Sequence, residues 1–361
     1  MPQANRLRYF AACNSENGFH CFYSRVFPET LSRVYIIKGG PGTGKSSLMR
    51  RAADRAEEKG YRVEEIYCSS DPNSLDGMIA YSDADPNGIA VLDGTAPHVR
   101  EATLAGARDE ILYVGDFWSS ERLAKHRSRI ETLSRDRSDA FGRLYRYLQA
   151  AGQCAQNMEA TVACGLDVRK IRETAASLLR VCPIGTGTSE KLMVMRSIGM
   201  SGPFRFSTLE EHADTVYLLR DCGGIAYRML DELYAQAKKR HLQMWLSYDP
   251  LIPTRLDGIC LPQFRQAFVI GDGKDLIRME SEGKKIHRLS LRRYISTDVL
   301  TRSSASLATA SKNKERLIHA AYEVLDEIRQ THFTLEQIYK ETMDFAALNR
   351  RIEQWLDEIM P

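Results

Sequence analysis

Short apolar runs, each followed by glycine, aspartate or serine, mark the first third of the chain. They predict four strands, over residues 33–38, 62–68, 88–93 and 111–114. Because these runs are largely apolar rather than alternating, they indicate a buried parallel sheet in an α/β fold. Right-handed crossovers would bring the carboxyl ends of the strands to one edge, where such sheets bind ligands. The residues expected at that edge are Lys38, Cys68, Asp93 and Asp116.

Two longer segments, residues 119–180 and 304–359, have apolar residues at a helical period, with charged residues between them. We expect each segment to form a long antiparallel helix pair that closes its half of the chain. The breaks are expected near Gly152 and near Thr331. The apolar stripe of the C-terminal pair suits a protein partner and packing between the two halves equally well.

The apolar runs of the first half return in the second half in the same order. Val34–Lys38 recurs as Val216–Arg220, an interval of 216 − 34 = 182 residues. Leu75-Asp-Gly77 recurs as Leu256-Asp-Gly258, and residues 89–93 are echoed more loosely by 267–271. Matches in one order at nearly one interval predict an internal duplication. We therefore expect a first domain over 1–182, a linker rich in Gly, Thr and Ser over 183–203, and a second domain over 204–361.

Composition narrows the class of protein. A chain of 361 residues with 43% apolar and 27% charged residues is typical of a soluble globular protein with two domains. The net charge of +3 is too small to argue for nucleic acid as a partner. The eight cysteines form no C-x-x-C pair, and neither a signal peptide nor a membrane-spanning apolar run is present, so we expect a cytoplasmic protein with no membrane association.

One motif carries clear chemistry. Gly39-Gly40-Pro41-Gly42-Thr43-Gly44-Lys45-Ser46 matches the pattern G-x-x-x-x-G-K-[ST], and it lies between an apolar strand and an amphipathic helix. Glycines let backbone N–H groups surround a phosphate, and the start of the helix adds its positive dipole end. The pattern predicts that Lys45 bridges the β- and γ-phosphates, that Ser46 binds Mg²⁺ and that Ser47 reaches the α-phosphate of a nucleotide triphosphate.

A Mg²⁺ site of this kind needs a second oxygen ligand at the end of a neighbouring strand. Asp93 ends the apolar run Ile89–Asp93, so we expect it to hold Mg²⁺ through water; the alternative is an ordinary Asp-Gly turn. Hydrolysis also needs a group that orients the attacking water. The candidates, each expected on a loop after a strand, are Asp71, Asp76, His98 and Asp116, and for each the alternative is a solvated or capping residue.

The loop Cys68–Gly77 is rich in hydroxyls and carboxylates. It could bind a substrate or sense the γ-phosphate, or it could be a pair of turns at Asp71-Pro72 and Asp76-Gly77.

The second half departs from the phosphate-binding pattern. When the repeats are aligned, the motif falls on Asp221–Arg228, where Tyr227 replaces the lysine and Arg228 replaces the serine. Asp221 adds a negative charge where a polyphosphate would lie, and like charges at close range repel. We therefore expect no nucleotide triphosphate in this half.

Several segments together resemble a known family. They are residues 38–46, 68–72, 75–77, 92–98, 115–118 and 145–148. The chain is similar over its whole length to uncharacterised bacterial two-domain P-loop proteins described as ATPases or ATP-binding proteins. The resemblance implies a duplicated P-loop fold, ATP at Gly39–Ser47 and the Walker B role for Asp93. It also implies a second phosphate loop in many members, from which residues 221–228 depart.

The sequence therefore predicts a protein whose first half binds ATP with Mg²⁺. The leading function is ATP hydrolysis coupled to a conformational change, with Lys45 and Asp93 as its catalytic residues. One alternative is a kinase that transfers phosphate to a small molecule held by the 68–77 loop. Another is a nucleotide-dependent switch without hydrolysis.

Overall fold

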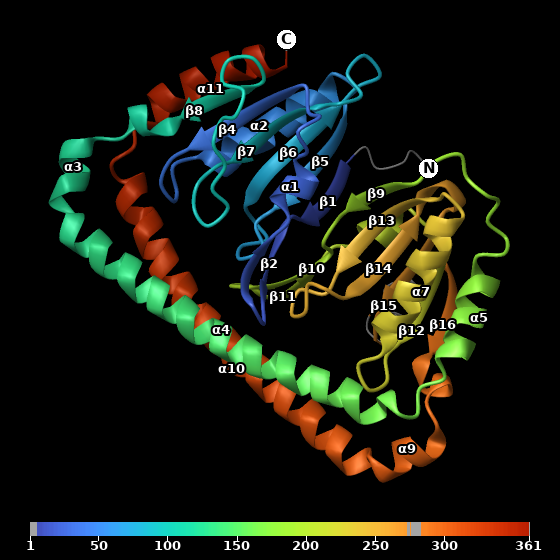
Figure 1. The fold of residues 1–361 in the computed structure, drawn as a ribbon. Helices are drawn as coiled ribbons and strands as arrows, with labels where there is room; N and C mark the ends of the chain where they lie inside the picture. The colour runs from blue at the N-terminus through green and yellow to red at the C-terminus, as the bar shows by residue number, and fades with distance from the viewer. Residues whose placement is uncertain (1–5, 273–274, 276–282, 361) are drawn as a thin grey trace.

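Two six-stranded sheets, each mostly parallel and flanked by helices, form the computed structural model, which describes residues 6–272, 275 and 283–360 (Figure 1). The sheets lie side by side, and two long helices span both along one flank (Figure 1). Within the described residues, no helix is both long and apolar enough to cross a membrane.

The first sheet has the order β1 (Arg6–Phe10), β5 (Arg62–Tyr67), β6 (Leu75–Tyr81), β7 (Ile89–Asp93), β4 (Arg33–Lys38), β8 (Asp109–Tyr113). The four predicted strands are confirmed, with ends shifted by at most two residues. The predicted parallel sheet is confirmed for most of its strands, and the exception is β6, which runs antiparallel to both of its neighbours. The connection from Tyr67 to Leu75 is too short for the crossover that a parallel neighbour requires.

The second sheet repeats this arrangement. Its order is β9 (Ser189–Leu192), β13 (Gln243–Tyr248), β14 (Leu256–Leu261), β15 (Gln266–Ile270), β12 (Thr215–Arg220), β16 (Lys285–Ser290), and only β14 is antiparallel to its neighbours. Two antiparallel hairpins lie between the sheets: β2 (Ala12–Ser15) with β3 (Gly18–Cys21), and β10 (Arg196–Gly199) with β11 (Gly202–Arg205). The expected linker 183–203 therefore contains β9, β10 and the start of β11.

The sheet register corrects one alignment. Gly94 donates its N–H to Ile37 O, and Gly271 donates its N–H to Leu219 O, at the same place in the two sheets. Gly271 is therefore the counterpart of Gly94, and the counterpart of Asp93 is Ile270 rather than Gly271. The second half thus lacks this carboxylate too.

The long helices differ from the prediction. α4 (Arg127–Ala163) continues through Gly152, and α10 (Ser304–Lys340) continues through Thr331, so neither segment breaks there. The antiparallel pair forms between α4 and α10, one helix from each half (Figure 1). A helical period shows that a face is apolar but does not identify what covers it. The buried side chains of this pair include Leu144, Leu148, Ala151, Ala321, Leu325 and Ile328.

Because each long helix runs from its own half of the chain to the other half, the helix that follows it packs on that other half. α5 (Val168–Leu178) packs with α7 (Ala226–Lys239) of the second half, and α11 (Phe345–Ile359) packs with α2 (Lys45–Glu58) of the first. Leu348, Ile352 and Leu356 of α11 are buried in the same core as β4. The other helices that the structure describes in full are short: α1 (Tyr23–Val26), η1 (Val114–Phe117), α3 (Ser120–Lys125), α6 (Thr208–Glu211), η2 (Pro262–Phe264), η3 (Leu291–Tyr294) and α9 (Thr297–Arg302).

The contacts between the halves are reciprocal. Asp344 donates its N–H to Phe117 O at 2.7 Å, and Asp167 donates its N–H to Tyr294 O at 2.8 Å. These bonds join equivalent positions, since α4 and α10 begin 304 − 127 = 177 residues apart and so do η1 and η3. Mutual contacts of this kind are the signature of a two-fold arrangement.

Candidate functional site

The glycine loop (Gly39–Ser46) connects β4 to α2 at the carboxyl edge of the first sheet. Gly44 caps α2 with a φ of 92°, and Gly42 has a φ of 68°, a region that side-chain-bearing residues rarely adopt. The expected apolar face of α2 is confirmed: Leu48, Met49, Ala52, Ala53 and Ala56 are buried. The helix is thereby fixed on the sheet with its first N–H groups directed at the loop.

Lys45 and Asp93 lie together beside this loop. The Lys45 ammonium donates to Gly39 O at 3.1 Å and to Gly40 O at 2.7 Å, and it lies 3.5 Å from Asp93 Oδ2. Asp93 Oδ1 accepts from the backbone N–H and the hydroxyl of Thr95 at 2.9 and 2.6 Å. One carboxylate oxygen of Asp93 is therefore held by Thr95, while the other faces the lysine.

The first residues of α2 are tied to the neighbouring strand. Ser46 Oγ accepts the N–H of Leu75 at 2.9 Å, which joins the glycine loop to the start of β6. Thr43 is buried and donates its hydroxyl to Gly40 O at 2.8 Å, so it stabilises the loop itself. Ser47 is exposed at the start of the helix, and Pro41 lies between Gly40 and Gly42.

Two of the four candidates for the catalytic base are brought together next to Asp93. His98 Nε2 lies 3.4 Å from Asp76 Oδ2, and His98 Nδ1 donates to Asp93 O at 3.2 Å. The imidazole stacks on Tyr23 at 4.7 Å, and all three residues are buried. Burial lowers the pKa of His98, but the nearby Asp76 and Asp93 outweigh it, so the pKa of His98 is raised.

Asp76 was expected on a loop, but it is the second residue of β6. This correction explains its burial, and the loop therefore ends at Ser74. The antiparallel direction of β6 still brings Asp76 to the carboxyl edge of the parallel strands.

The other two candidates lie apart from this pair. Asp71 accepts the N–H of Asn73 at 3.1 Å and shapes the 71–74 turn, which matches the turn alternative for this segment. Asp116 is exposed in η1, after β8, rather than on a loop. Of the other residues expected at this edge, Lys38 binds Gly94 O and Arg100 O, and Cys68 donates its N–H to Ser74 O.

The far end of the chain covers the glycine loop, which sequence reasoning missed. A Cβ at Gly40 would lie 2.6 Å from the Tyr339 ring, one at Gly42 would lie 3.0 Å from Glu336, and one at Gly44 would lie 3.1 Å from Leu348. These neighbours belong to α10 and α11, about 300 positions away along the chain. No local pattern links segments at that separation, because only the exchange of helices between the halves brings them together.

Glu336 and Lys340 are charged residues of this cover, and a Cβ at Gly42 would lie 3.0 Å from each of them. Glu336 pairs with His332 at 3.5 Å and with Lys340 at 2.8 Å, one helical turn on either side. The bond from His332 and the charge of Lys340 lower the pKa of Glu336 to about 2, although partial burial opposes the shift.

The second-half loop (Asp221–Arg228) is closed by its own side chains. The Asp221 carboxylate accepts the N–H groups of Gly224 and Ala226 at 2.9 and 2.8 Å. Glu159 of α4 lies over this loop, as Glu336 of α10 lies over the first, and binds Arg228 at 2.6 Å and Arg255 at 2.7 Å. A carboxylate thus takes the N–H groups that would otherwise face an anion.

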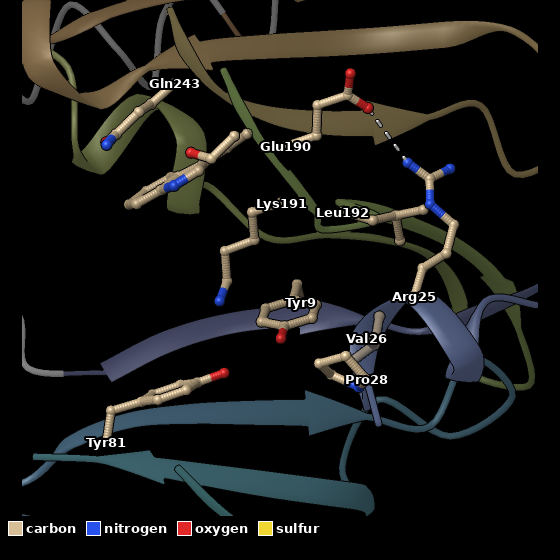
Figure 2. Close-up of a pocket in the computed structure, with 11 residues that line it drawn as sticks. Tyr9, Arg25, Val26, Pro28, Tyr81, Glu190, Lys191, Leu192 and Gln243 are labelled. Atoms are coloured by element: carbon tan, nitrogen blue, oxygen red, sulfur yellow. Dashed lines mark ion pairs between the residues drawn. The ribbon is translucent and has the colours of Figure 1, made fainter. Parts of the chain in front are cut away.

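A separate cavity of about 290 Å³ lies where the edge strands β1 and β9 meet (Figure 2). Its charged groups are paired: Arg25 lies 3.9 Å from Glu190, and Lys191 binds Glu64. Tyr81 lines it from the end of β6 opposite to Leu75, so at about 3.3 Å per residue it lies about 20 Å from the glycine loop. This cavity is distinct from the candidate site.

Comparison with known protein families, with curated proteins and with solved structures finds no match for this chain. In the described part of the chain, no group of three or more His, Cys, Asp or Glu side chains is arranged to hold a metal ion by itself.

Proposed function

We propose that the first half binds MgATP and that the protein hydrolyses it to ADP and phosphate, coupled to a conformational change. The observation that carries this proposal is the position of the Lys45 ammonium, between two loop carbonyls and 3.5 Å from Asp93. A lysine ammonium that donates to neutral backbone carbonyls at a helix N-terminus has donors that charged phosphate oxygens would take instead.

The residues present also suit Mg²⁺. Ser46 Oγ and Asp93 Oδ2 are hard oxygen donors beside the loop, and Mg²⁺ is usually held by one or two protein oxygens together with phosphate oxygens and water. This explains why no complete protein cage is needed. When bound, the ion would neutralise charge on the β- and γ-phosphates. Ser46 and Asp93 are the residues that would hold it.

We assign the orientation of the attacking water to the Asp76–His98 pair. Asp76 pairs with His98, and His98 Nδ1 donates to the backbone oxygen of Asp93, so the pair lies beside the proposed metal ligand Asp93. A carboxylate beside a histidine can accept a proton from water or hold it by hydrogen bonding. Asp71 and Asp116 lack a partner of this kind at the loop.

The conformational part of the proposal rests on the helix cover. α10 and α11 contact the glycine loop at three glycines, and α10 runs from there to the second half. At about 1.5 Å per residue, its 37 residues span about 55 Å. A change in the loop on nucleotide binding would therefore be transmitted to the other half.

We further propose that the chain is an internal duplication with one working site. Matching strand orders, reciprocal contacts and a constant interval in the helical part support the duplication. Tyr227, Arg228 and Ile270 replace the lysine, serine and aspartate of the first half, and Asp221 occupies the anion position. The second half therefore serves to cover and position the first.

The kinase alternative has less support. The 68–74 loop is closed by the β10–β11 hairpin, because Met200 donates its N–H to Ser70 O at 2.7 Å and Gly199 packs on Ser69 and Ser70. Phosphate release in water without an acceptor distinguishes hydrolysis from phosphate transfer, and binding without release indicates a switch.

The test measures MgATP binding by calorimetry and by the shift in thermal unfolding. At 100 times its dissociation constant, MgATP should stabilise the native protein by about 2.7 kcal/mol. Lys45→Ala should abolish that stabilisation, whereas Lys312→Ala, at an exposed position of α10, should leave it intact. If Lys45→Ala retains the full shift, the assigned site is wrong.

A further inference from the structure

A second cavity, of about 360 Å³, lies at the carboxyl end of β8. One wall consists of residues 116–119 and Arg122 of the first half, and the other consists of residues 342–344 and Ala347. The second wall is the connection between α10 and α11, so the cavity exists only because these helices return to the first half. Its volume is within the range of small-molecule sites.

The cavity adjoins the glycine loop. Tyr339, just before the second wall, lies over Gly40 and packs edge-on against Trp118 at 5.8 Å. Phe345 and Leu348, which flank Ala347, lie 4.0 and 3.1 Å from the Cβ position of Gly44. The residues that line the cavity therefore alternate along the chain with those that contact the loop.

The order of strands in the first sheet places this cavity on a defined side of the expected phosphate site. β7, which carries Asp93, lies on one side of β4, and β8 lies on the other. With the metal and the terminal phosphate on the β7 side, the remainder of a nucleotide extends toward β8 and η1. That is where the cavity lies.

In the second half, the position equivalent to this cavity is occupied by side chains. The position of Ala347 is taken by Lys170, 177 residues earlier, which donates to Arg293 O at 3.4 Å and lies over the Tyr294 ring at 5.9 Å. Arg293 also replaces Asp116. The half that lacks the phosphate-binding residues therefore also fills this position, while the half that has them leaves it open.

We propose that this cavity binds the purine nucleoside of the triphosphate held by Gly39–Ser47, an inference that rests on the proposed function. The Trp118 ring offers a surface for stacking of a base. Asp116 and Arg122 at the rim offer an acceptor for ribose hydroxyls and a donor for the base edge. The nucleoside site is thus assembled from both halves of the chain.

The test is Ala347→Lys, which introduces the residue of the second half, with Ala346→Lys as the matched control on the exposed side of the same helix turn. The probes are MgATP and magnesium tripolyphosphate, which carries the phosphates without a nucleoside. Ala347→Lys should weaken MgATP binding at least tenfold and leave tripolyphosphate binding within twofold, whereas Ala346→Lys should change neither. Asp116→Ala, at an exposed position, should weaken MgATP selectively by several-fold.

Three results would overturn the proposal. Unchanged MgATP affinity in Ala347→Lys and Asp116→Ala means that the nucleoside lies elsewhere. Equal loss of both probes in Ala347→Lys means that the variant acts through the loop. Equal effects of Ala347→Lys and Ala346→Lys mean that added charge rather than filled space is responsible. In each of these three cases, the proposed function still holds if Lys45→Ala loses binding of both MgATP and tripolyphosphate. Undiminished binding of both probes by Lys45→Ala would refute the proposed function instead.

Discussion

Gly40→Ala tests whether the α10 cover shapes the glycine loop. Gly40 does not adopt a positive φ, so alanine is not excluded by its backbone conformation. Its Cβ would, however, lie 2.6, 2.8 and 3.0 Å from three carbons of the Tyr339 ring. Because carbon atoms prefer about 3.5 to 4.0 Å, the ring must move by about 1 Å.

Such overpacking typically costs about 1 to 3 kcal/mol of unfolding free energy. We expect Gly40→Ala to lower the stability by about 2 kcal/mol and to weaken MgATP binding, since the loop and the ring must separate. Removing the ring should remove the clash. In a Tyr339→Ala background, Gly40→Ala should therefore cost less than about 0.5 kcal/mol, which leaves a coupling energy of more than 1 kcal/mol between the two sites.

The measurement is urea unfolding of the wild type, the two single variants and the double variant, with the MgATP affinity of each. Gly142→Ala provides the control, because a Cβ there meets no atom within 4 Å, and in a helix it should stabilise by about 0.5 to 1 kcal/mol. Strictly additive costs at Gly40 and Tyr339 would refute the contact between α10 and the loop.

Two further predictions concern charge. Calorimetry should return one MgATP per chain, and Asp221→Ala should not create a second site, because Tyr227 and Arg228 still lack the lysine and serine chemistry; two ATP per chain in the wild type would contradict the one-site model. Glu336→Gln should lower stability near pH 7 by about 1 kcal/mol, from the loss of its partly exposed ion pair with Lys340 and of its contact with His332, which is an ion pair only when the imidazole is protonated. Because the pKa of Glu336 in the folded protein is lowered to about 2, its contribution to the unfolding free energy is full above its ordinary pKa and is lost as the pH falls through about 2. If the difference in unfolding free energy between wild type and Glu336→Gln stays constant from pH 5 to pH 2, these contacts do not stabilise the fold.

The local elements were predictable because their signals are local. Runs with apolar residues identified β4, β5, β7 and β8, although β5 also contains Glu64 and Glu65, and apolar spacing identified the buried face of α2. β6 was missed because Leu75-Asp76-Gly77 contains turn residues, yet Asp76 and Gly77 lie inside a buried strand where the packed Phe27 leaves no room for a Cβ at Gly77. At these positions, tertiary packing outweighs the local preference of Asp and Gly for turns.

The candidate site was predicted in part. The glycine loop, Lys45 and Asp93 follow from a motif and the strand beside it, and they lie together in the structure. The sequence offered Asp71, Asp76, His98 and Asp116 without a choice among them. Only the folded chain pairs Asp76 with His98, because β6 runs antiparallel and brings its first residues to the same edge.

The sequence alone determined the buried face of α2, the place of the glycine-rich G-x-x-x-x-G-K-[ST] motif and the absence of its lysine and serine from the second half, since each depends on residue type and short spacing. The tertiary structure decided which apolar stripe meets which. The stripes of α4 and α10 are buried against each other and not within their own segments, which carries α11 to the glycine loop and α5 to the second half. The hydrophobic effect favours burial of an apolar surface without specifying which surface covers it. Only the geometry of the whole chain therefore selects the helices that cover the site.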